Sequence, residues 1–448
     1  MSMRLPTALG AAAATWLVAA CLQAPLALAQ TTPAAPAAIT DQDISDAYIY
    51  LFGRLLVTRQ QQLDFKDGLQ WNTLHHRKPG AVAWANPNLD VAYSEAWVGI
   101  DENSCTLVSV PKVVDRYYTV QFLNGWGETL ANINEREFPK HPDGEFAVCL
   151  KDAKVSLPAG TQRIDVPART LRVLSRVELG KDWSEAERLQ HQFTMRPSGS
   201  PKLPEVPQTL MFAAGQLPGV EAFDSATVAL QEPDINPGME TQQANVRAIA
   251  AAIADPAERA RIDKSIRTVA FANIAKASPL MGHGTAKNGW ARPATSGVYG
   301  NDFLTRTLVN YGGIWANNQK EVVYYRGTLD DQGQPLQSTQ SYSVTFPADQ
   351  LPDTLANYYW SITVTDSKTF LVLPNPLNRF SLNDQADLKY NPDGSLTLYF
   401  APEQPKDAPQ GNWLPTQPGH NYRMIFRFYG PKNGAVSGDY YPPVIKRS

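Results

Sequence analysis

Short β-like segments occur in two blocks of this chain, and this division constrains the fold more than any other feature of the sequence. The first block runs from about residue 82 to 177 and the second from about residue 321 to 429, with turn residues between the segments. Short strands at regular intervals are typical of antiparallel sandwiches. A helix-like pattern fills the residues between the blocks. The predicted fold class is therefore α+β, mainly β with helices, with two antiparallel β-sandwich or jelly-roll-like domains joined by a helical segment.

The predicted domain boundaries follow from this pattern. With 448 residues the chain is long enough for two cores, and its 35 prolines and 10% aromatic residues favour β-rich, loop-rich construction. We expect a signal peptide at 1–29, a linker at 30–39, a helix plus sandwich at 40–195, a helical connecting region at 196–320 and a second sandwich at 321–448.

Two helices are predicted with defined ends. Thr40 is a candidate N-cap, and apolar residues at three-to-four spacing predict a helix from there to about Leu63. A second helix is expected from Asn301 or Asp302 to about Gln319. It contains Gly312-Gly313, and glycines inside a helix indicate close packing or a kink.

The N-terminus has the pattern of a secretory signal peptide. Arg4 precedes an apolar stretch at 8–22, and Ala27-Leu28-Ala29 is a small-residue cleavage site. Pro25 interrupts the apolar run short of the ~20 residues needed to span a bilayer. We therefore expect a periplasmic or secreted protein with no transmembrane span in the mature chain. Cleavage and lipidation at Cys21 is the alternative.

Two cysteines remain after the predicted cleavage. Cys105 and Cys149 lie in short apolar runs that suit neighbouring strands, so a disulfide is the preferred prediction in an oxidising compartment. Two buried free thiols are the alternative.

Several function classes lack support in the sequence. A net charge of −3 gives no electrostatic footprint for nucleic acid. The chain has no GxSxG, HExxH, GxGxxG or P-loop motif, so no cofactor is expected. No metal site is expected either, because there is no CxxC spacing and the sequence places no third ligand beside His75-His76.

The polar turn from Trp84 to Tyr93 is the main site candidate. It contains Asn86, Asn88 and Asp90 around a proline, although Asn and Asp beside Pro are also ordinary turn formers. Arg116, at the mouth of a predicted strand, is expected to pair Asp90, either as a catalytic pair or as a structural clamp. An aspartate held by arginine has a lowered pKa and is a poorer base, which favours binding over catalysis.

These residues carry a resemblance to a known family. Asn86-Pro87-Asn88-Leu89-Asp90 and Asp115-Arg116-Tyr117-Tyr118 resemble motifs of the DUF1254 domain. Tyr359-Trp360-Ser361-Ile362-Thr363, Asn378-Arg379-Phe380-Ser381, Asn412-Trp413-Leu414-Pro415 and Arg427-Phe428-Tyr429-Gly430 resemble the DUF1214 domain that usually follows it. The resemblance implies an exported bacterial protein with paired β-sandwiches linked by helices, and no settled activity.

Two functions remain open. The first is binding of a polar small molecule or saccharide in a cleft lined by aromatic, Asn and Arg residues, unless most of the tryptophans are core. The second is a hydrolase or lyase in which Asp90 acts as acid or base beside a stabilising arginine. The sequence leaves open whether the chain is an enzyme and whether it forms a homo-oligomer. The candidate ligand-binding residues are Asn86, Asn88, Tyr93, Tyr117, Trp126, Trp360, Asn378, Arg379, Asn412 and Trp413.

Overall fold

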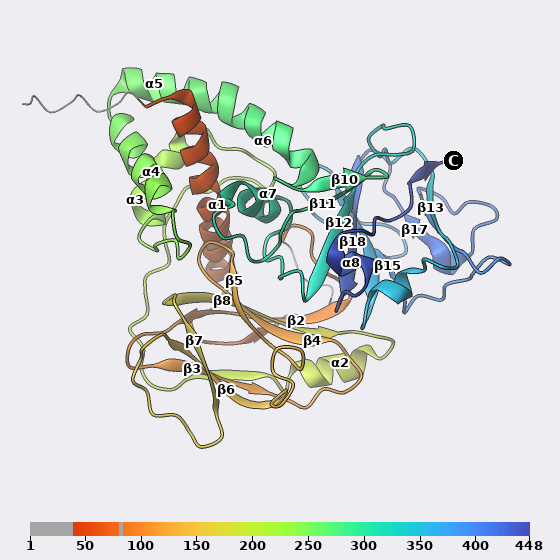
Figure 1. Ribbon diagram of the computed structural model, residues 1–448, viewed down its shortest axis with the longest axis horizontal. Helices are drawn as coiled ribbons and strands as arrows, with labels where there is room; N and C mark the ends of the chain where they lie inside the picture. Colours follow the sequence, from red (N-terminus) through yellow and green to blue (C-terminus); the bar gives the residue numbers. More distant parts are fainter. Residues whose placement is uncertain (1–38, 80–83) are drawn as a thin grey trace, which may run out of the picture. The chain divides into compact units, whose positions relative to one another are not determined.

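The computed structural model describes residues 39–79 and 84–448, and residues 39–448 form one compact unit (Figure 1). The predicted signal peptide, Cys21 and all but the last residue of the predicted linker lie outside the described residues. Among the described helices, none is both long enough and apolar enough to cross a membrane.

Helix α1 (Asp41–Lys66) begins where the sequence predicts. The Thr40 side chain accepts a hydrogen bond from the Asp43 N–H, and the Asp43 carboxylate accepts one from the Thr40 N–H, which completes a capping box. Helical residues including Tyr48, Leu51 and Leu55 are fully buried against the other helices. The helices that follow are α2 (Trp183–Gln190), α3 (Ala226–Ala229), α4 (Glu240–Ala252), α5 (Pro256–Ser265), α6 (Phe271–Ala277), α7 (Phe303–Gly313) and α8 (Gly434–Ser437).

The N-terminal β region consists of a five-stranded sheet, ordered β1-β2-β8-β4-β5, and a four-stranded sheet, ordered β7-β6-β3-β9. One hydrophobic core contains residues of both sheets, including Val120 and Val173 from the first and Val108 and Phe146 from the second. The strands are β1 (His75–His76), β2 (Val91–Gly99), β3 (Cys105–Val110), β4 (Tyr118–Leu123), β5 (Thr129–Ile133), β6 (Gly144–Leu150), β7 (Gln162–Val166), β8 (Thr170–Glu178) and β9 (Thr194–Pro197).

The C-terminal β region also has two sheets around one core. Its six-stranded sheet is ordered β10-β11-β12-β18-β14-β15, and its four-stranded sheet β17-β16-β13-β19. The strands are β10 (Thr285–Lys287), β11 (Trp290–Arg292), β12 (Val322–Gly327), β13 (Tyr342–Phe346), β14 (Trp360–Asp366), β15 (Ser381–Asn383), β16 (Leu396–Ala401), β17 (Trp413–Pro415), β18 (Tyr422–Tyr429) and β19 (Lys446–Arg447).

The predicted fold class is confirmed, with differences in detail. Helix α7 ends at Gly313 and not near Gln319, because the chain at Ile314 leaves helical geometry. Strands β10 and β11 lie in the region predicted to be helical, yet they join the C-terminal sheet. Two strand pairs, β6–β7 and β16–β17, are parallel. Residues 369–373, inside the second predicted β block, make only an isolated bridge at Val372.

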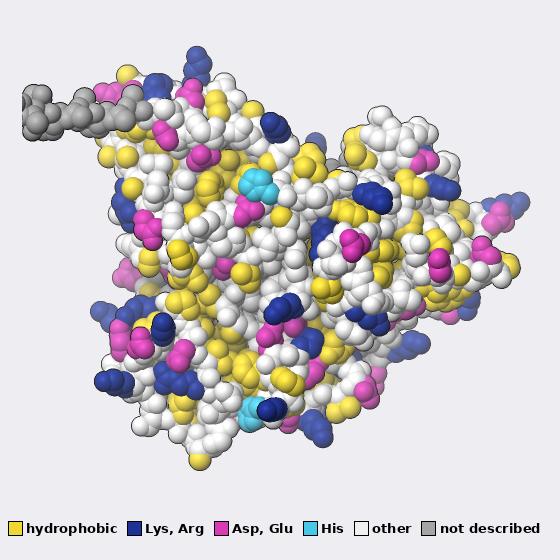
Figure 2. Space-filling view, viewed as in Figure 1, with side chains coloured by type: hydrophobic (Ala, Val, Ile, Leu, Met, Phe, Trp, Pro, Cys, Tyr) yellow, Lys and Arg dark blue, Asp and Glu magenta, His cyan; other side chains and the backbone are white. Residues whose placement is uncertain are grey.

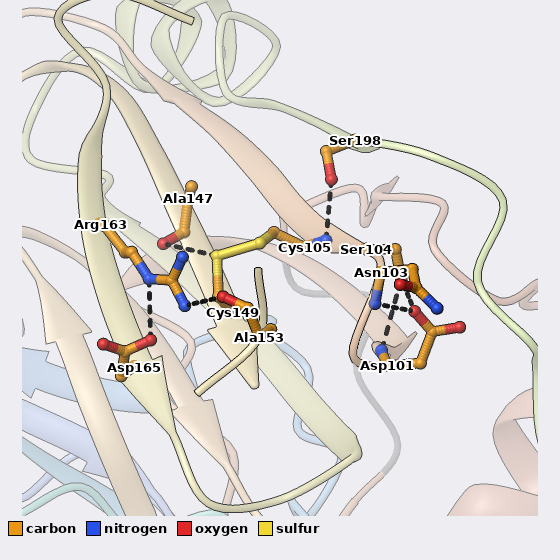
Figure 3. The surroundings of a disulfide bond; sticks show 10 residues. All are labelled: Asp101, Asn103, Ser104, Cys105, Ala147, Cys149, Ala153, Arg163, Asp165 and Ser198. Carbon is orange, nitrogen blue, oxygen red and sulfur yellow. Dashed lines mark hydrogen bonds and ion pairs between the residues drawn. A yellow bond between two sulfur atoms is a disulfide. The ribbon is translucent and has the colours of Figure 1, made fainter. Parts of the chain in front are cut away.

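The predicted disulfide joins Cys105 and Cys149, which are directly opposite each other on β3 and β6 (Figure 3). Their Cα atoms are 4.4 Å apart, within the range that a disulfide spans. The bond links two residues that are 44 positions apart in the sequence, within the smaller N-terminal sheet.

The two larger sheets each use one face for their own core and the other for the neighbouring β region. On β18, Met424, Phe426 and Phe428 lie in the C-terminal core, so strand alternation puts Arg427 and Tyr429 on the opposite face. Tyr429 belongs to a mixed aromatic cluster that also contains Tyr93, Trp97 and Tyr117 from the N-terminal sheet, together with Tyr359 and Trp315. The two β regions therefore share a buried, polar-aromatic interface.

Candidate functional site

An arginine holds the turn that the sequence singles out, but it is not Arg116. Arg427 donates hydrogen bonds from Nη2 to the carbonyl oxygens of Asn86 (2.9 Å) and Pro87 (3.3 Å), and from Nη1 to Thr363 Oγ1 (2.8 Å). The turn is thus held by the C-terminal sheet, across the interface.

The predicted pair of Asp90 and Arg116 is wrong. Asp90 Oδ1 accepts hydrogen bonds from Ser381 Oγ (2.7 Å) and Asn383 Nδ2 (2.8 Å), and the buried Oδ2 has no partner among the described residues. Arg116 Nη1 instead donates to the carbonyl oxygens of Glu178 (2.5 Å) and Leu179 (2.7 Å). A hydroxyl and an amide therefore hold Asp90 in place of the predicted arginine.

The two asparagines of the turn are fixed by partners from other parts of the chain. Asn86 has a positive φ of 47°, which Asn adopts more readily than most residues, and its side chain bonds the Gly312 carbonyl and Thr365 Oγ1. Asn88 Nδ2 donates to the hydroxyls of Tyr359 (2.7 Å) and Tyr429 (2.5 Å), whose rings stack 4.2 Å apart.

A cavity of about 80 Å³ lies beside this turn, between the two β regions and the end of α7. The turn contributes Trp84, Asn86 and Asn88, so the first two predicted ligand-binding asparagines line it together with Tyr93 of β2. The end of α7 packs beside the turn, and a Cβ on Gly313 would lie 3.4 Å from Asn86, in ordinary van der Waals contact. We name this space the arginine cavity for the three side chains described next.

Three buried arginines line the arginine cavity: Arg176 of β8, Arg326 of β12 and Arg427 of β18. Arg176 donates to Gln121 Oε1 (2.6 Å) and to the Trp315 carbonyl (3.2 Å). Arg326 donates to the Ser278 and Pro279 carbonyls. The described residues of the lining include no Asp or Glu, so the arginines give it a formal charge of +3.

Two buried donors of the lining have no acceptor within the described structure. They are Trp315 Nε1 and Arg326 Nε. Trp315 also has a φ of 68°, which is strained for an aromatic residue. Unpaired donors and backbone strain both occur preferentially at functional sites.

An outer cleft of about 320 Å³ adjoins the arginine cavity. Trp84 and Ile314 line both spaces and therefore form the partition between them. The cleft is bounded by the second half of α1, including Arg59 and Asp64, and by Tyr311 of α7.

Carboxylates gather on the other side of the stacked tyrosines. Asp90 and Glu178 line a small space of about 30 Å³ with Tyr359, and Gln385 connects it to a space of about 380 Å³ lined by Asp353 and Asp384. Here these spaces are together called the acidic pocket.

The acidic pocket changes the protonation of its own side chains. Burial, and then the charges of Glu178 and Asp353, raise the pKa of Asp384 to about 7. Burial also raises the pKa of Glu178. Within the described residues, no three His, Cys, Asp or Glu side chains are placed to hold a metal ion.

The other predicted ligand-binding residues do not line the arginine cavity. Trp126 is buried in the helical core and Trp360 in the C-terminal core. Trp360 Nε1 donates a hydrogen bond to Asp353 (2.6 Å). Tyr117 is fully buried and donates to Glu321 (3.2 Å). Arg379, Asn412 and Trp413 bond main-chain groups of the C-terminal region, and Asn378 is exposed on a loop there.

Sequence reasoning missed most of the charged lining. Arg427 and Tyr429 belong to a motif of the DUF1214 resemblance, and their alternation with Phe426 and Phe428 indicates two differently used faces of one strand. Arg176 and Arg326 have no such local signal, because their positions depend on how the two sheets meet.

Comparisons with known proteins agree with this organisation. Residues 71–197 match the family described as "Protein of unknown function (DUF1254)", and residues 321–433 match "Protein of unknown function (DUF1214)". A search of curated proteins found no match.

Two solved structures are similar to this chain. The VPA0106 protein from Vibrio parahaemolyticus is 20% identical with a TM-score of 0.61, and the match covers 91% of this chain and 100% of that one. An uncharacterised protein from Burkholderia cenocepacia is 13% identical with a TM-score of 0.46, over 91% and 92% of the two chains. The first of these likenesses supports the fold. The chain is a two-domain protein that combines a DUF1254 domain with a DUF1214 domain.

Proposed function

We propose that this protein binds a polar small molecule in the arginine cavity. The observation that carries the proposal is that unpaired buried donors, Trp315 Nε1 and Arg326 Nε, line a cavity between the two family domains. A buried donor without an acceptor costs about 1–3 kcal/mol, and a ligand acceptor would remove that cost. Aromatic walls with a few convergent polar groups are typical of small-molecule sites.

The location of the protein is part of the proposal. The signal-peptide pattern at 1–29 and the Cys105–Cys149 disulfide both support export to an oxidising compartment. Figure 2 shows basic and acidic side chains interspersed over one face, which offers no single-sign surface for nucleic acid.

A thermal-shift screen of the full chain tests the binding proposal. The panel contains neutral sugars, uronates, short mono- and dicarboxylates and aromatic acids. Val309 of α7 lines the cavity, so Val309→Phe should fill it, whereas Val309→Ala should enlarge it. We expect a saturable shift with at least one class in the wild type and in Val309→Ala, and none in Val309→Phe. No saturable shift, or one that Val309→Phe leaves intact, would refute the proposal.

A second candidate function is carboxylate acid–base chemistry in the acidic pocket. It is favoured by the pKa of about 7 for Asp384, because a general acid or base works best with a pKa near the operating pH. Chromogenic esters and glycosides provide the assay. Activity should fall at least ~100-fold in Asp384→Asn and persist in Asp387→Asn, whose carboxylate is exposed and bonds Lys389. Equal activity in both variants would exclude Asp384.

A further inference from the structure

Four buried or largely buried arginines of this protein have a carboxylate partner. Arg136 pairs with Glu321 (2.7 Å), Arg306 with Asp234 (2.7 Å) and Arg54 with Glu232 (3.8 Å). Arg172 likewise lies beside Glu95 and Asp64. These four guanidinium groups each have a carboxylate from the chain itself.

In the part of the chain that the structure describes, the arginines of the cavity have no carboxylate partner. Arg176, Arg326 and Arg427 are 6%, 8% and 2% exposed, and their bonds within the described chain go to neutral oxygens. Residues 1–38 and 80–83 contain no Asp or Glu that could supply a counter-charge. Arg292 is also buried with only neutral partners among the described residues, but it stands apart from the cavity. Removing a charge from water without a charged partner is costly, so three such charges in one lining favour a bound anion.

The tyrosines of the lining do not neutralise this charge. Burial raises the pKa of Tyr324 and of Tyr429, so both phenols stay protonated at neutral pH and act as hydrogen-bonding groups. Burial also lowers the pKa of Arg326 to about 10, and no acidic neighbour offsets that effect. Arg326 nevertheless remains charged at neutral pH.

Apolar side chains complete the lining. Leu308 and Val309 of α7 and Ile425 of β18 face the same space, beside the Trp84 and Trp315 rings. Inorganic phosphate would leave this apolar surface uncovered, whereas an organic acid covers it. At roughly 10–15 Å³ for one water, the cavity of about 80 Å³ suits roughly five to eight water-sized groups.

We propose that the ligand of the arginine cavity is a small organic acid, whose carboxylate binds the Arg176, Arg326 and Arg427 guanidinium groups while its carbon skeleton contacts the apolar wall. This inference rests on the proposed function and names the chemical class of its ligand. The planar guanidinium fork matches a carboxylate, and charge-assisted bonds of this kind are roughly twice as strong as neutral ones.

Calorimetric titration of the full chain tests the class with paired probes. Acetate, succinate and benzoate are compared with acetamide, succinamide and benzamide, which have similar shapes and no charge. Glucose and inorganic phosphate complete the set. We expect at least one acid to bind, with its amide about 10- to 100-fold weaker.

Matched variants then assign the effect to the cavity. Arg326→Met should weaken acid binding by about 10- to 100-fold, and Arg326→Lys should recover part of it by keeping the charge. Arg292→Met is the control, because Arg292 is also buried and bonds only carbonyls and a phenol, yet does not line the cavity. Its acid affinity should stay within about threefold of the wild type, well below the change expected at Arg326.

The outcomes separate this inference from the proposed function. If an amide or glucose binds as tightly as the acids, or if Arg326→Met leaves acid affinity unchanged, the ligand is not an organic acid but cavity binding stands. Binding of phosphate without any carboxylate also overturns the organic-acid class. If no probe and no member of the thermal-shift panel binds, both proposals fail.

Discussion

The arginine cavity and the acidic pocket lie on opposite sides of one polar turn, and they carry opposite charges. The stacked Tyr359–Tyr429 pair separates them, because Tyr429 lines the first and Tyr359 the second, and Asn88 bonds both hydroxyls. The fold could have paired these charges with one another. Instead the arginines and the carboxylates lie in separate regions, so each region retains unpaired charge at a cost in folding free energy. Such a cost is expected where charge serves binding or chemistry.

The largest expected effect comes from removing the side chain that bonds both tyrosines between the two regions. Asn88→Leu should lower the free energy of unfolding by about 3 kcal/mol, because two buried phenol hydroxyls and the Asp90 N–H lose their partner. Urea denaturation measures the change. In the control Asn421→Ala, which alters an exposed asparagine, the loss should stay below about 0.5 kcal/mol. Equal losses of unfolding free energy in the two variants would mean that the hydrogen bonds of Asn88 do not stabilise the fold.

A second carboxylate beside Asp90 should make the acidic pocket more negative and so increase its difference in charge from the arginine cavity. Asn383→Asp replaces the donor to Asp90 Oδ1 with an acid, so we expect a loss of about 2 kcal/mol at pH 8. At pH 5 the loss should be smaller, since one of the two acids can bind a proton. Asn383→Ala removes the bond without adding charge, and its smaller loss should not depend on pH. Parallel pH profiles for the two variants would contradict the expectation.

Asp384 should make stability depend on pH. Its pKa is raised from the ordinary value of 3.8 to about 7, so the folded state binds more protons than the unfolded state between these values. Stability therefore falls as pH rises from about 4 to about 7. Because the side chain is partly exposed, solvent screening reduces the effect, and Asp384→Asn should gain about 1 kcal/mol at pH 8. Asp387→Asn should show no such gain.

The smallest effect is expected at an indole of the arginine cavity. Trp97 and Trp315 are both buried and lie edge to face, 5.8 Å apart. Within residues 39–79 and 84–448, only Trp97 Nε1 has an acceptor, Asp64 Oδ2 at 2.8 Å. If each ring is replaced by Phe, the cost of the lost bond at Trp97 should exceed that at Trp315 by about 1 kcal/mol. Equal losses in denaturation would mean that Trp315 Nε1 is satisfied in the free protein.

Local signals in the sequence predict much of the fold. Thr40, as a candidate N-cap, predicts the start of α1, and two apolar runs place Cys105 and Cys149 on neighbouring strands. The end of α7 was missed because Gly312-Gly313 is compatible with a kink as well as with termination. Short strands such as β10 and β11 have too few residues to show an alternating pattern.

The candidate site was predicted only in part, for a physical reason. The turn with Asn86 and Asn88 has a local signature, and it does line the cavity. The partners of Asp90 have no local signature in the sequence. Ser381 and Asn383 are almost 300 positions away, and only the packing of one β region on the other brings them close. Arg116 lies at the mouth of a predicted strand, but the folded chain directs it to two carbonyls.

The bonds from Arg427 to the carbonyls of Asn86 and Pro87 have a consequence for how such a chain can evolve. If either family domain were made alone, its side of these hydrogen bonds would face solvent. Its half of the aromatic interface would also be exposed. The two domains are therefore expected to be inherited, lost and exchanged together. Compensating substitutions should also link the turn around residue 86 to the last long strand, more than 330 positions downstream.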